Sequence, residues 1–457
     1  MSSIELDHAA RSADFAGELV RPGDPSYDEA RTLFNAMIDR RPAAIARCAS
    51  AGDVAGAIRM GRERGLEIAV RGGGHGVAGK ALTDGGLVVD LRRMNAVTVD
   101  PRARTATVAG GALMSDLDRA TAPHGLATTG GRVSTTGVAG LTLGGGNGWL
   151  DRRFGLACDN LLSVDLVTAD GGRLRASETE NADLFWALHG GGGNFGVAVS
   201  LTFRLYPLSM VTVAKLLWPS DAAPAVAWAY RDYMETAPDE IGSALLLLTA
   251  PPADFVPPHL VGRPACAVVL MYAGTGPEAR GRMAPMLALG HEAEMLAEVA
   301  YADFQCMNED PPGFRNHWSA DHLACLPDDA VDTFCAHAAG MLVPSPSAQA
   351  LIPQGGAIAR GRASYPIPWR QAPWHVARFA MWADPADDDR ATTWARGLGP
   401  ALGSWTSGDV YLNFTGDEGR DRVVAGLGAE NYARLTAVKA RFDPDNLFHL
   451  NHNIAPG

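Results

Sequence analysis

The sequence predicts an α+β protein with two main domains, and three observations support this fold class. The chain has 457 residues, more than one ordinary hydrophobic core accommodates. Its first half combines few helical segments with many closely spaced strands, unlike the regular alternation of a doubly wound sheet. Its second half, from residue 211, contains longer apolar strands and amphipathic helices, which indicates an antiparallel sheet backed by helices.

The first half supplies the clearest local signals. Residues 51–65 have the apolar spacing of a helix with Asp53 in its first turn, and residues 113–125 predict a second, shorter helix. Short apolar runs bounded by glycine and polar turn residues predict strands at 45–50, 66–70, 86–91, 96–100 and 105–111.

The domain boundaries follow from changes in these patterns. We expect a lead-in at 1–37, a first domain at 38–210, a second domain at 211–405 and a C-terminal segment at 406–457. Within the second domain, residues 276–290 and 328–342 predict helices. The C-terminal segment is expected to contain a strand at 410–414 and a helix at 431–443, and to return to the first domain.

Composition narrows the class of partner. The net charge of −12 and the pI of about 5.5 argue against nucleic acid and anionic membranes. The N-terminal sequence is acidic and lacks an apolar core, and no run of 18 apolar residues is present, so we expect a cytoplasmic protein. The six cysteines form no CxxC pair or zinc-ligand spacing, so no metal site is predicted.

Glycine is concentrated in three loops of the first half. These loops are RGGGHGVAG at 71–79, the segment at 128–160 with its LGGGNG turn, and HGGGGNFGVAVS at 189–200. The first loop matches the GxGxxG pattern, but the segment after it is too short for the crossover helix of a Rossmann unit. Successive backbone N–H groups can still bind a pyrophosphate, and glycine backbone can lie flat against a planar ligand. The loops therefore predict a dinucleotide held by a different fold.

His75 lies inside the first loop, with glycine on both sides. From its chemistry alone, this histidine can contact phosphate, act as a catalytic base or anchor a flavin covalently, because neutral imidazole is a competent nucleophile. The residues themselves do not rank these three roles.

The ordered motifs resemble one family. RGGGHGVAG, GLVVDLRRMNAVTVD, FGLACDNLLSVDLVTADG, DLFWALHGGGGNFGV and the C-terminal YLNF and FDPDNLFHLNHNI follow its pattern across nearly the whole chain. The sequence is similar to the vanillyl-alcohol oxidase / p-cresol methylhydroxylase flavoproteins, in their berberine-bridge-enzyme-like branch. The resemblance implies a two-part FAD-binding domain of the p-cresol methylhydroxylase type at 38–210, with an antiparallel-sheet substrate domain.

The resemblance also assigns residues to the cofactor. It implies that the 8α-methyl group of FAD is joined to His75. The remaining cofactor contacts that it implies are Arg71, Gly72, Gly73, Gly74, Gly76, Gly79, Thr136, Gly137, Gly140, Leu141, Gly144, Gly145, Asp159, Asn160, Gly196, Val197, Asn413, Asn451 and Asn453. The three asparagines also have an alternative interpretation as ordinary turn residues.

Two departures from the family pattern matter. Many members form a second flavin bond from a cysteine, but Val133 stands at that position, so a single covalent link is expected; Cys158 lies nearby but outside the motif. Several relatives carry a charged group where this chain has Ile352, Pro353 and Gln354. The sheet of the second domain therefore offers no obvious carboxylate base.

The resemblance makes Tyr411 the candidate catalytic acid or base, with core packing as its alternative. In a strand at 410–414, Tyr411 and Asn413 would face the cofactor together. The substrate pocket is expected to be apolar and aromatic, with Trp318 assigned to the core instead. Its expected wall consists of Trp149, Tyr365, Trp369 and Arg370, the last as an anion contact.

These expectations define an FAD-dependent oxidase acting on a small organic molecule. Hydride transfer to flavin N5 would be followed by reoxidation with O2 to give H2O2. A dehydrogenase, an oxygenase-like tailoring enzyme of a natural-product pathway and a flavin-carrying binding protein without turnover are the alternatives. Rapid reoxidation of the reduced flavin in air would distinguish an oxidase from the dehydrogenase and the binding protein.

Overall fold

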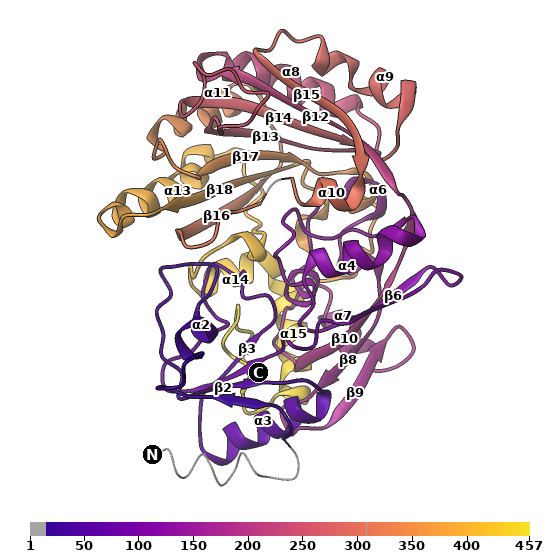
Figure 1. Cartoon of the computed structure of the whole chain (residues 1–457), viewed down its shortest axis with the longest axis vertical. Coiled ribbons are helices and arrows are strands. Elements are labelled where there is room, and N and C mark those ends of the chain that lie inside the picture. Colours follow the sequence, from indigo (N-terminus) through magenta and orange to yellow (C-terminus); the bar gives the residue numbers. More distant parts are fainter. Residues whose placement is uncertain (1–14, 308) are drawn as a thin grey trace.

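The computed structural model describes residues 15–307 and 309–457, and its strands form three main sheets in two parts (Figure 1). The N-terminal half builds the part drawn at the bottom, and the largest sheet with its helices builds the part drawn at the top. The C-terminal segment, in yellow, lies back against the lower part. This arrangement confirms the α+β fold class, whereas the predicted domain boundaries remain a prediction.

The first sheet has four strands and begins the lower part. Its order is β1 (Glu18–Val20), β2 (Ala44–Arg47), β4 (Leu87–Asp90) and β3 (Ile68–Arg71), with β2, β4 and β3 parallel. The predicted helix between β2 and β3 is α3 (Ala51–Glu63), which Ser50 caps by accepting a hydrogen bond from the Asp53 amide. The apolar residues of α3 pack on the sheet. The first glycine loop begins where β3 ends.

The second sheet is antiparallel and has five strands. Their order is β5 (Val97–Asp100), β6 (Thr105–Ala109), β10 (Val197–Arg204), β8 (Leu161–Val167) and β9 (Arg173–Ser177). The helix predicted between β6 and the second glycine loop is α4 (Met114–Thr121). The second and third glycine loops precede β8 and β10, so this sheet positions both.

The third sheet is antiparallel and forms the upper part. Its seven strands are ordered β15 (Ala293–Ala300), β12 (Met210–Pro219), β14 (Pro264–Tyr272), β13 (Ile241–Thr249), β17 (Ala348–Pro353), β18 (Trp374–Trp382) and β16 (Arg315–Leu323). Helices pack on one face and bury its apolar residues, namely α8 (Ala223–Thr236), α9 (Gly276–Leu287), α11 (Asp328–His337) and α13 (Asp388–Leu402). Because successive side chains of a strand point to opposite faces, the remaining side chains of this sheet project from the face that the helices leave uncovered. That face is the one turned toward the lower part.

The C-terminal segment contains α14 (Arg420–Leu427) and α15 (Ala429–Phe442), the second of which was predicted. It is fixed to the lower part by Lys439, whose buried ammonium donates to the carbonyl oxygens of Asn194 and Phe448 and pairs with Asp443. The strand predicted at 410–414 is wrong. Residues Leu412–Phe414 form a 3-10 turn, in which the Asn413 side chain donates to the Leu141 carbonyl.

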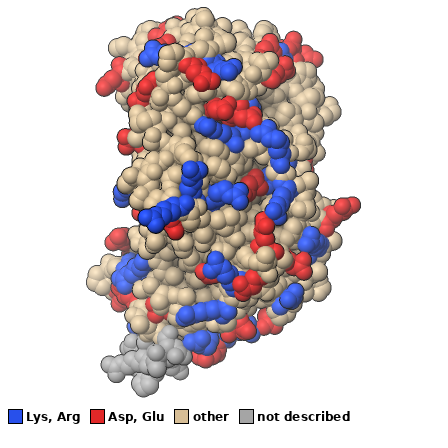
Figure 2. All heavy atoms as spheres, turned by 90° about the vertical axis from the view of Figure 1, so that its right-hand side faces the viewer, with Lys and Arg blue, Asp and Glu red and all other residues tan. Residues whose placement is uncertain are grey.

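Charged side chains of both signs are interspersed over the face drawn in Figure 2. Over the described residues, every helix is too short or too polar to cross a bilayer.

Candidate functional site

A cavity of about 490 Å³ is bordered by the glycine loops on one side and the third sheet on the other. Its size falls within the range of small-molecule and cofactor sites. Mostly backbone and small side chains border the cavity from the three glycine loops and the C-terminal segment. The sheet contributes apolar side chains, chiefly Leu246, Val269, Trp318, Ala348, Ala350, Ile352, Phe379 and Met381.

The first loop leaves β3 and approaches the second loop backbone to backbone. A Cβ atom added to Gly73 would lie 2.5 Å from the Gly137 nitrogen, and one added to Gly137 would lie 2.5 Å from the Gly73 nitrogen. Gly74 has a φ of +72°, which an L side chain rarely adopts. Gly76, by contrast, has no atom within 4 Å of such a Cβ and borders the cavity. The glycines thus close the loop contact and leave open space beside the backbone.

His75 lies on the cavity wall between Phe34 and Trp318. Its ring stacks on Phe34 with centroids 4.0 Å apart, and the Trp318 ring lies edge-on at 6.0 Å. Burial lowers the pKa of His75 to about 4, so the imidazole is neutral at pH 7. Its Nε2 atom is buried and has no hydrogen-bond partner among the described residues. This is a neutral nitrogen nucleophile beside a cofactor-sized cavity.

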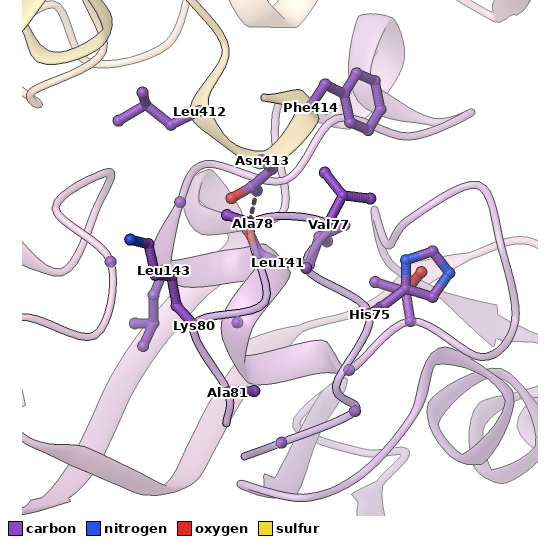
Figure 3. A pocket seen from close by; sticks show the side chains of 18 of the residues that line it. His75, Val77, Ala78, Lys80, Ala81, Leu141, Leu143, Leu412, Asn413 and Phe414 are labelled. Carbon is purple, nitrogen blue, oxygen red and sulfur yellow. Dashed lines mark hydrogen bonds between the residues drawn. The ribbon is translucent and has the colours of Figure 1, made fainter. Parts of the chain in front are cut away.

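Figure 3 shows how the first loop faces the C-terminal turn across α5 (Val138–Leu143). The side chains of His75 and Val77 belong to the first loop, Lys80 follows it directly, and Asn413 reaches down from the opposite segment. Asn413 donates to the Leu141 carbonyl at 2.9 Å. A Cβ atom on Gly144 would collide with the Asn413 side-chain oxygen, so glycine is required where the two segments meet.

The third loop also borders the cavity. Gly192 and Gly193 border it and have no atom within 4 Å of an added Cβ, so their backbone is open to a ligand. Asn194 holds the loop by donating to the carbonyls of Gly191 and His452, and its own Oδ1 accepts from the Ile454 amide. The three loops together therefore present open glycine backbone around one cavity, as a dinucleotide requires.

Most of the expected cofactor contacts meet at this cavity. Those that border it are Gly72, Gly73, Gly74, His75, Gly76, Thr136, Gly137, Gly140, Leu141, Gly144, Gly196, Val197, Asn413 and Asn451. Those that do not border it are Arg71, Gly79, Gly145, Asp159, Asn160 and Asn453. Arg71, for example, donates to the carbonyls of Ala30 and Thr32, and so supports the first loop from behind.

The expected substrate wall needs correction. Trp149 borders the cavity, but Tyr365, Trp369 and Arg370 do not. Arg370 instead donates to the Asp159 carboxylate at 2.8 Å, and its charge is balanced there. Tyr365 stacks on His189, and Trp369 stacks on His322, so both rings pack inside the protein. Trp318, assigned to the core from sequence, borders the cavity.

Tyr411 is buried next to the cavity wall rather than on it. Its hydroxyl oxygen accepts hydrogen bonds from the amides of Gly146 and Asn147 and from Asn413 Nδ2, at 2.8 to 3.2 Å. Burial nevertheless raises the pKa of Tyr411 to about 12, because it outweighs these three donors. Tyr411, the expected acid or base, is therefore placed where its hydroxyl holds the Gly146 turn and the Asn413 side chain.

Sequence reasoning missed several residues that border the cavity, notably Arg132, Asn147, Asp310 and Phe379. Phe379 and Ala348 are register partners on adjacent strands, and Trp318 pairs with Phe379 from the other side. These three residues lie on three different strands, so no pattern within one strand identifies the face that they share. No sequence signal distinguished Asp310, which lies in the irregular segment before β16.

The open glycine backbone, the enclosed volume and the neutral histidine define a site for a flavin dinucleotide. Comparisons with known proteins agree with this class. An FAD binding domain model matches residues 42–177, and a berberine and berberine-like model matches residues 410–455.

Relatives match over nearly the whole chain. The chain is 32% identical to (R)-6-hydroxynicotine oxidase of Paenarthrobacter nicotinovorans, covering 96% of this chain and 97% of that protein. A crystal structure of 6-hydroxy-D-nicotine oxidase from Arthrobacter nicotinovorans superposes with a TM-score of 0.86, at 29% identity over 98% of this chain and all of that one. The BBE-like 1 protein of Physcomitrella patens shares the fold, with a TM-score of 0.87 at 22% identity over 99% of both chains.

The chain belongs to the vanillyl-alcohol oxidase / p-cresol methylhydroxylase flavoproteins, in the berberine-bridge-enzyme-like branch. It is an FAD-linked oxidoreductase.

Proposed function

We propose that this protein is an oxidase with one FAD joined covalently through His75, acting on a small apolar substrate. The observation that carries the proposal is the neutral His75 on the wall of a glycine-lined cavity, whose Nε2 atom has no partner within residues 15–307 and 309–457. When bound, FAD accepts a hydride at N5 and delivers the electrons to O2, which gives H2O2.

The covalent link is proposed to be single. Forming it replaces a hydrogen of the flavin 8α-methyl group and the proton of one imidazole nitrogen by a C–N bond; the two electrons released pass through the flavin to O2. Val133, at the position where relatives carry cysteine, borders the cavity and has no nucleophile. Cys158 is buried outside the lining, and burial raises the pKa of its thiol well above the usual range, which keeps it protonated and unreactive.

The test of the link uses purified holoprotein. We expect the protein to stay yellow after acid precipitation and to weigh one FAD more than the bare chain. His75→Ala should lose the colour on precipitation, whereas the control Cys158→Ala should keep it. A His75→Ala protein that retains flavin after denaturation would refute attachment at this residue.

The test of the oxidase assignment measures reoxidation. We expect the photoreduced holoprotein to return to the oxidised spectrum within seconds in air-saturated buffer, with one H2O2 formed per flavin. Reoxidation over many minutes, together with rapid electron transfer to an artificial acceptor dye, would instead favour a dehydrogenase.

The substrate class follows from the sheet side of the cavity. Trp318 and Phe379 meet edge to face at 4.9 Å, and small or aliphatic residues of β13 and β17 surround them. A ligand that buries apolar surface and aromatic faces against such a wall binds with a favourable free energy. We therefore infer a substrate with an apolar or aromatic body. An anaerobic screen of amines, alcohols, phenols and sugars, followed by flavin bleaching, tests this inference; bleaching by sugars alone would contradict it.

A further inference from the structure

Residues 34–36 of the lead-in connect the first glycine loop with the third sheet. The Phe34 amide donates to the Gly74 carbonyl at 3.3 Å, and the Ala36 amide donates to the Phe314 carbonyl at 2.9 Å. The first of these carbonyls belongs to the residue directly before the proposed flavin anchor, and the second to the residue directly before β16. A short piece of the N-terminal segment therefore contacts both the loop that carries the anchor and the sheet opposite it.

Asn35 strengthens this connection with its buried side chain. Its Nδ2 atom donates to the carbonyls of Val77 at 2.8 Å and Asn316 at 2.9 Å. Its Oδ1 atom accepts from the amides of Asn316 at 2.9 Å and Met37 at 3.0 Å. Both donors and both acceptor positions of the side-chain amide are thus used, which makes this a well-defined polar contact. Val77 belongs to the first loop and Asn316 to β16, so the neighbouring Phe34 is held in place relative to both.

The Phe34 ring covers one face of the His75 ring. Their centroids are 4.0 Å apart and the ring planes differ by 10°. Trp318 lies edge-on to both rings, at 5.8 Å from Phe34 and 6.0 Å from His75, and its own Nε1 donates to Asn316 Oδ1 at 3.1 Å. His75 and Trp318 border the cavity, whereas Phe34 does not. Phe34 can therefore act on a group bound in the cavity only through His75.

The imidazole of His75 has few other restraints. Rotation of a histidine ring about its Cβ–Cγ bond is broad, and the flanking Gly74 and Gly76 have no side chains to confine it. Among the described residues, its Nε2 has no hydrogen-bond partner, and the only hydrogen bond that raises its pKa comes from its own backbone. The lone pair of a neutral imidazole nitrogen lies in the ring plane. Stacking on Phe34 therefore fixes that plane without covering the reactive nitrogen.

We propose that Phe34 is a positioning residue for the covalent attachment of FAD, because it holds the His75 ring in one orientation. Attachment joins an imidazole nitrogen to the flavin 8α carbon. A C–H bond of the methyl group and the imidazole N–H bond break, and the two electrons and two protons convert O2 to H2O2. Restricting a nucleophile to one orientation can account for large rate factors. This inference rests on the proposed covalent link and adds the residue that orients its nucleophile.

The test measures attachment separately from binding. The full chain is produced in riboflavin-limited cells and mixed with FAD in air. Quenching of FAD fluorescence gives the Kd of the first complex, and the flavin that stays with acid-precipitated protein gives the attachment rate. Phe34→Leu keeps the apolar bulk but removes the flat ring, so the attachment rate should fall roughly tenfold or more. The Kd should stay within about twofold of wild type, because Phe34 does not border the cavity.

Two further variants separate orientation from fold stability. Phe34→Tyr restores a flat ring and should attach FAD within about threefold of the wild-type rate, because it can stack on His75 as phenylalanine does. Phe154→Leu is the matched control. Phe154 is half-buried like Phe34 and stacks on Tyr206 at 4.0 Å with an interplanar angle of 3°, and neither ring borders the cavity. Removing this second stack should leave the attachment rate within about twofold of wild type.

Four results would overturn the inference. They are attachment by Phe34→Leu at the wild-type rate, an equal loss in Phe34→Tyr, an equal loss in Phe154→Leu, and weaker FAD binding that accounts for the whole loss in Phe34→Leu. With acid-stable flavin in the wild type, each of them refutes the role of Phe34 and leaves the proposed function intact. Wild-type protein that never acquires acid-stable flavin would refute the proposed covalent link, and the role of Phe34 with it.

Discussion

The two sides of the cavity are built by different means. On the lower side, glycine backbone from three loops borders the open space, and side chains matter mainly where they hold those loops, as Asn413 holds α5. On the upper side, the wall consists of side chains that project from regular strands. Backbone recognition suits a cofactor shared by a whole family, whereas strand side chains can be exchanged one at a time without altering the sheet. The comparison predicts that flavin binding and substrate binding can be broken independently.

The largest expected effect is loss of the cofactor from the glycine side. Gly137→Ala places a methyl group 2.5 Å from the Gly73 nitrogen, and both partners are backbone that cannot move without opening the loop contact. We expect the flavin-to-protein absorbance ratio after gel filtration to fall to less than about a tenth of wild type, given the cost of such overpacking. Gly281→Ala in α9, where an added methyl group meets nothing, is the control. Full flavin content in Gly137→Ala would show that the contact is not required.

The converse variant acts on the sheet side. Phe379→Ala removes an aromatic ring that borders the cavity and contacts Trp318 and Phe414 edge to face. We expect substrate affinity, measured by anaerobic flavin bleaching, to fall roughly tenfold from the lost apolar contact. Flavin content should remain at the wild-type level. A variant that lost flavin as well would show that the two sides are not independent.

A third variant concerns the boundary between the two sides. If Tyr411 were the general base, Tyr411→Phe would lower the rate of flavin reduction by about 10² to 10⁴. Its hydroxyl oxygen instead accepts three hydrogen bonds and does not border the cavity. We therefore expect a loss of less than about tenfold, with a larger loss in Asn413→Ala, because Asn413 contacts both Tyr411 and Leu141. A loss of a hundredfold in Tyr411→Phe would restore its role as the base.

The same contrast explains what could be predicted from the sequence. Glycine runs are visible as composition, and the spacing around His75 predicts a cofactor loop without knowledge of its partners. The helix α3 and the strands β2, β3 and β4 are likewise local patterns, whereas β1 lies in the lead-in, where no strand was predicted. The substrate wall depends on which residues of distant strands share a face, as Trp318, Phe379 and Ala348 do. Single-sequence periodicity does not reveal that pairing.

Other errors have specific physical causes. Arg370 looked like an anion contact, but the Asp159 carboxylate from a distant segment already takes its charge. The tyrosine at 411 and the asparagine at 413 looked like a strand, but their side chains form hydrogen bonds with each other and with the loop at 141–147. In both cases a polar partner far away in the chain overrides the local pattern.

The smallest expected effect is on acid stability, where the two sides should behave alike. His189 in the lower part and His322 in the third sheet are buried, and burial lowers their pKa values to about 4 and about 3. In the unfolded chain a histidine titrates near 6.5, so below that pH the unfolded state binds protons that the folded state does not. Stability should therefore fall as the pH decreases from about 6.5 toward 4, with a steeper slope in wild type than in His322→Gln. Urea unfolding midpoints at pH 7.5, 6 and 5 measure this slope. A wild-type midpoint that stays constant over that range would mean that the histidines become protonated in the folded protein, which their enclosed rings argue against.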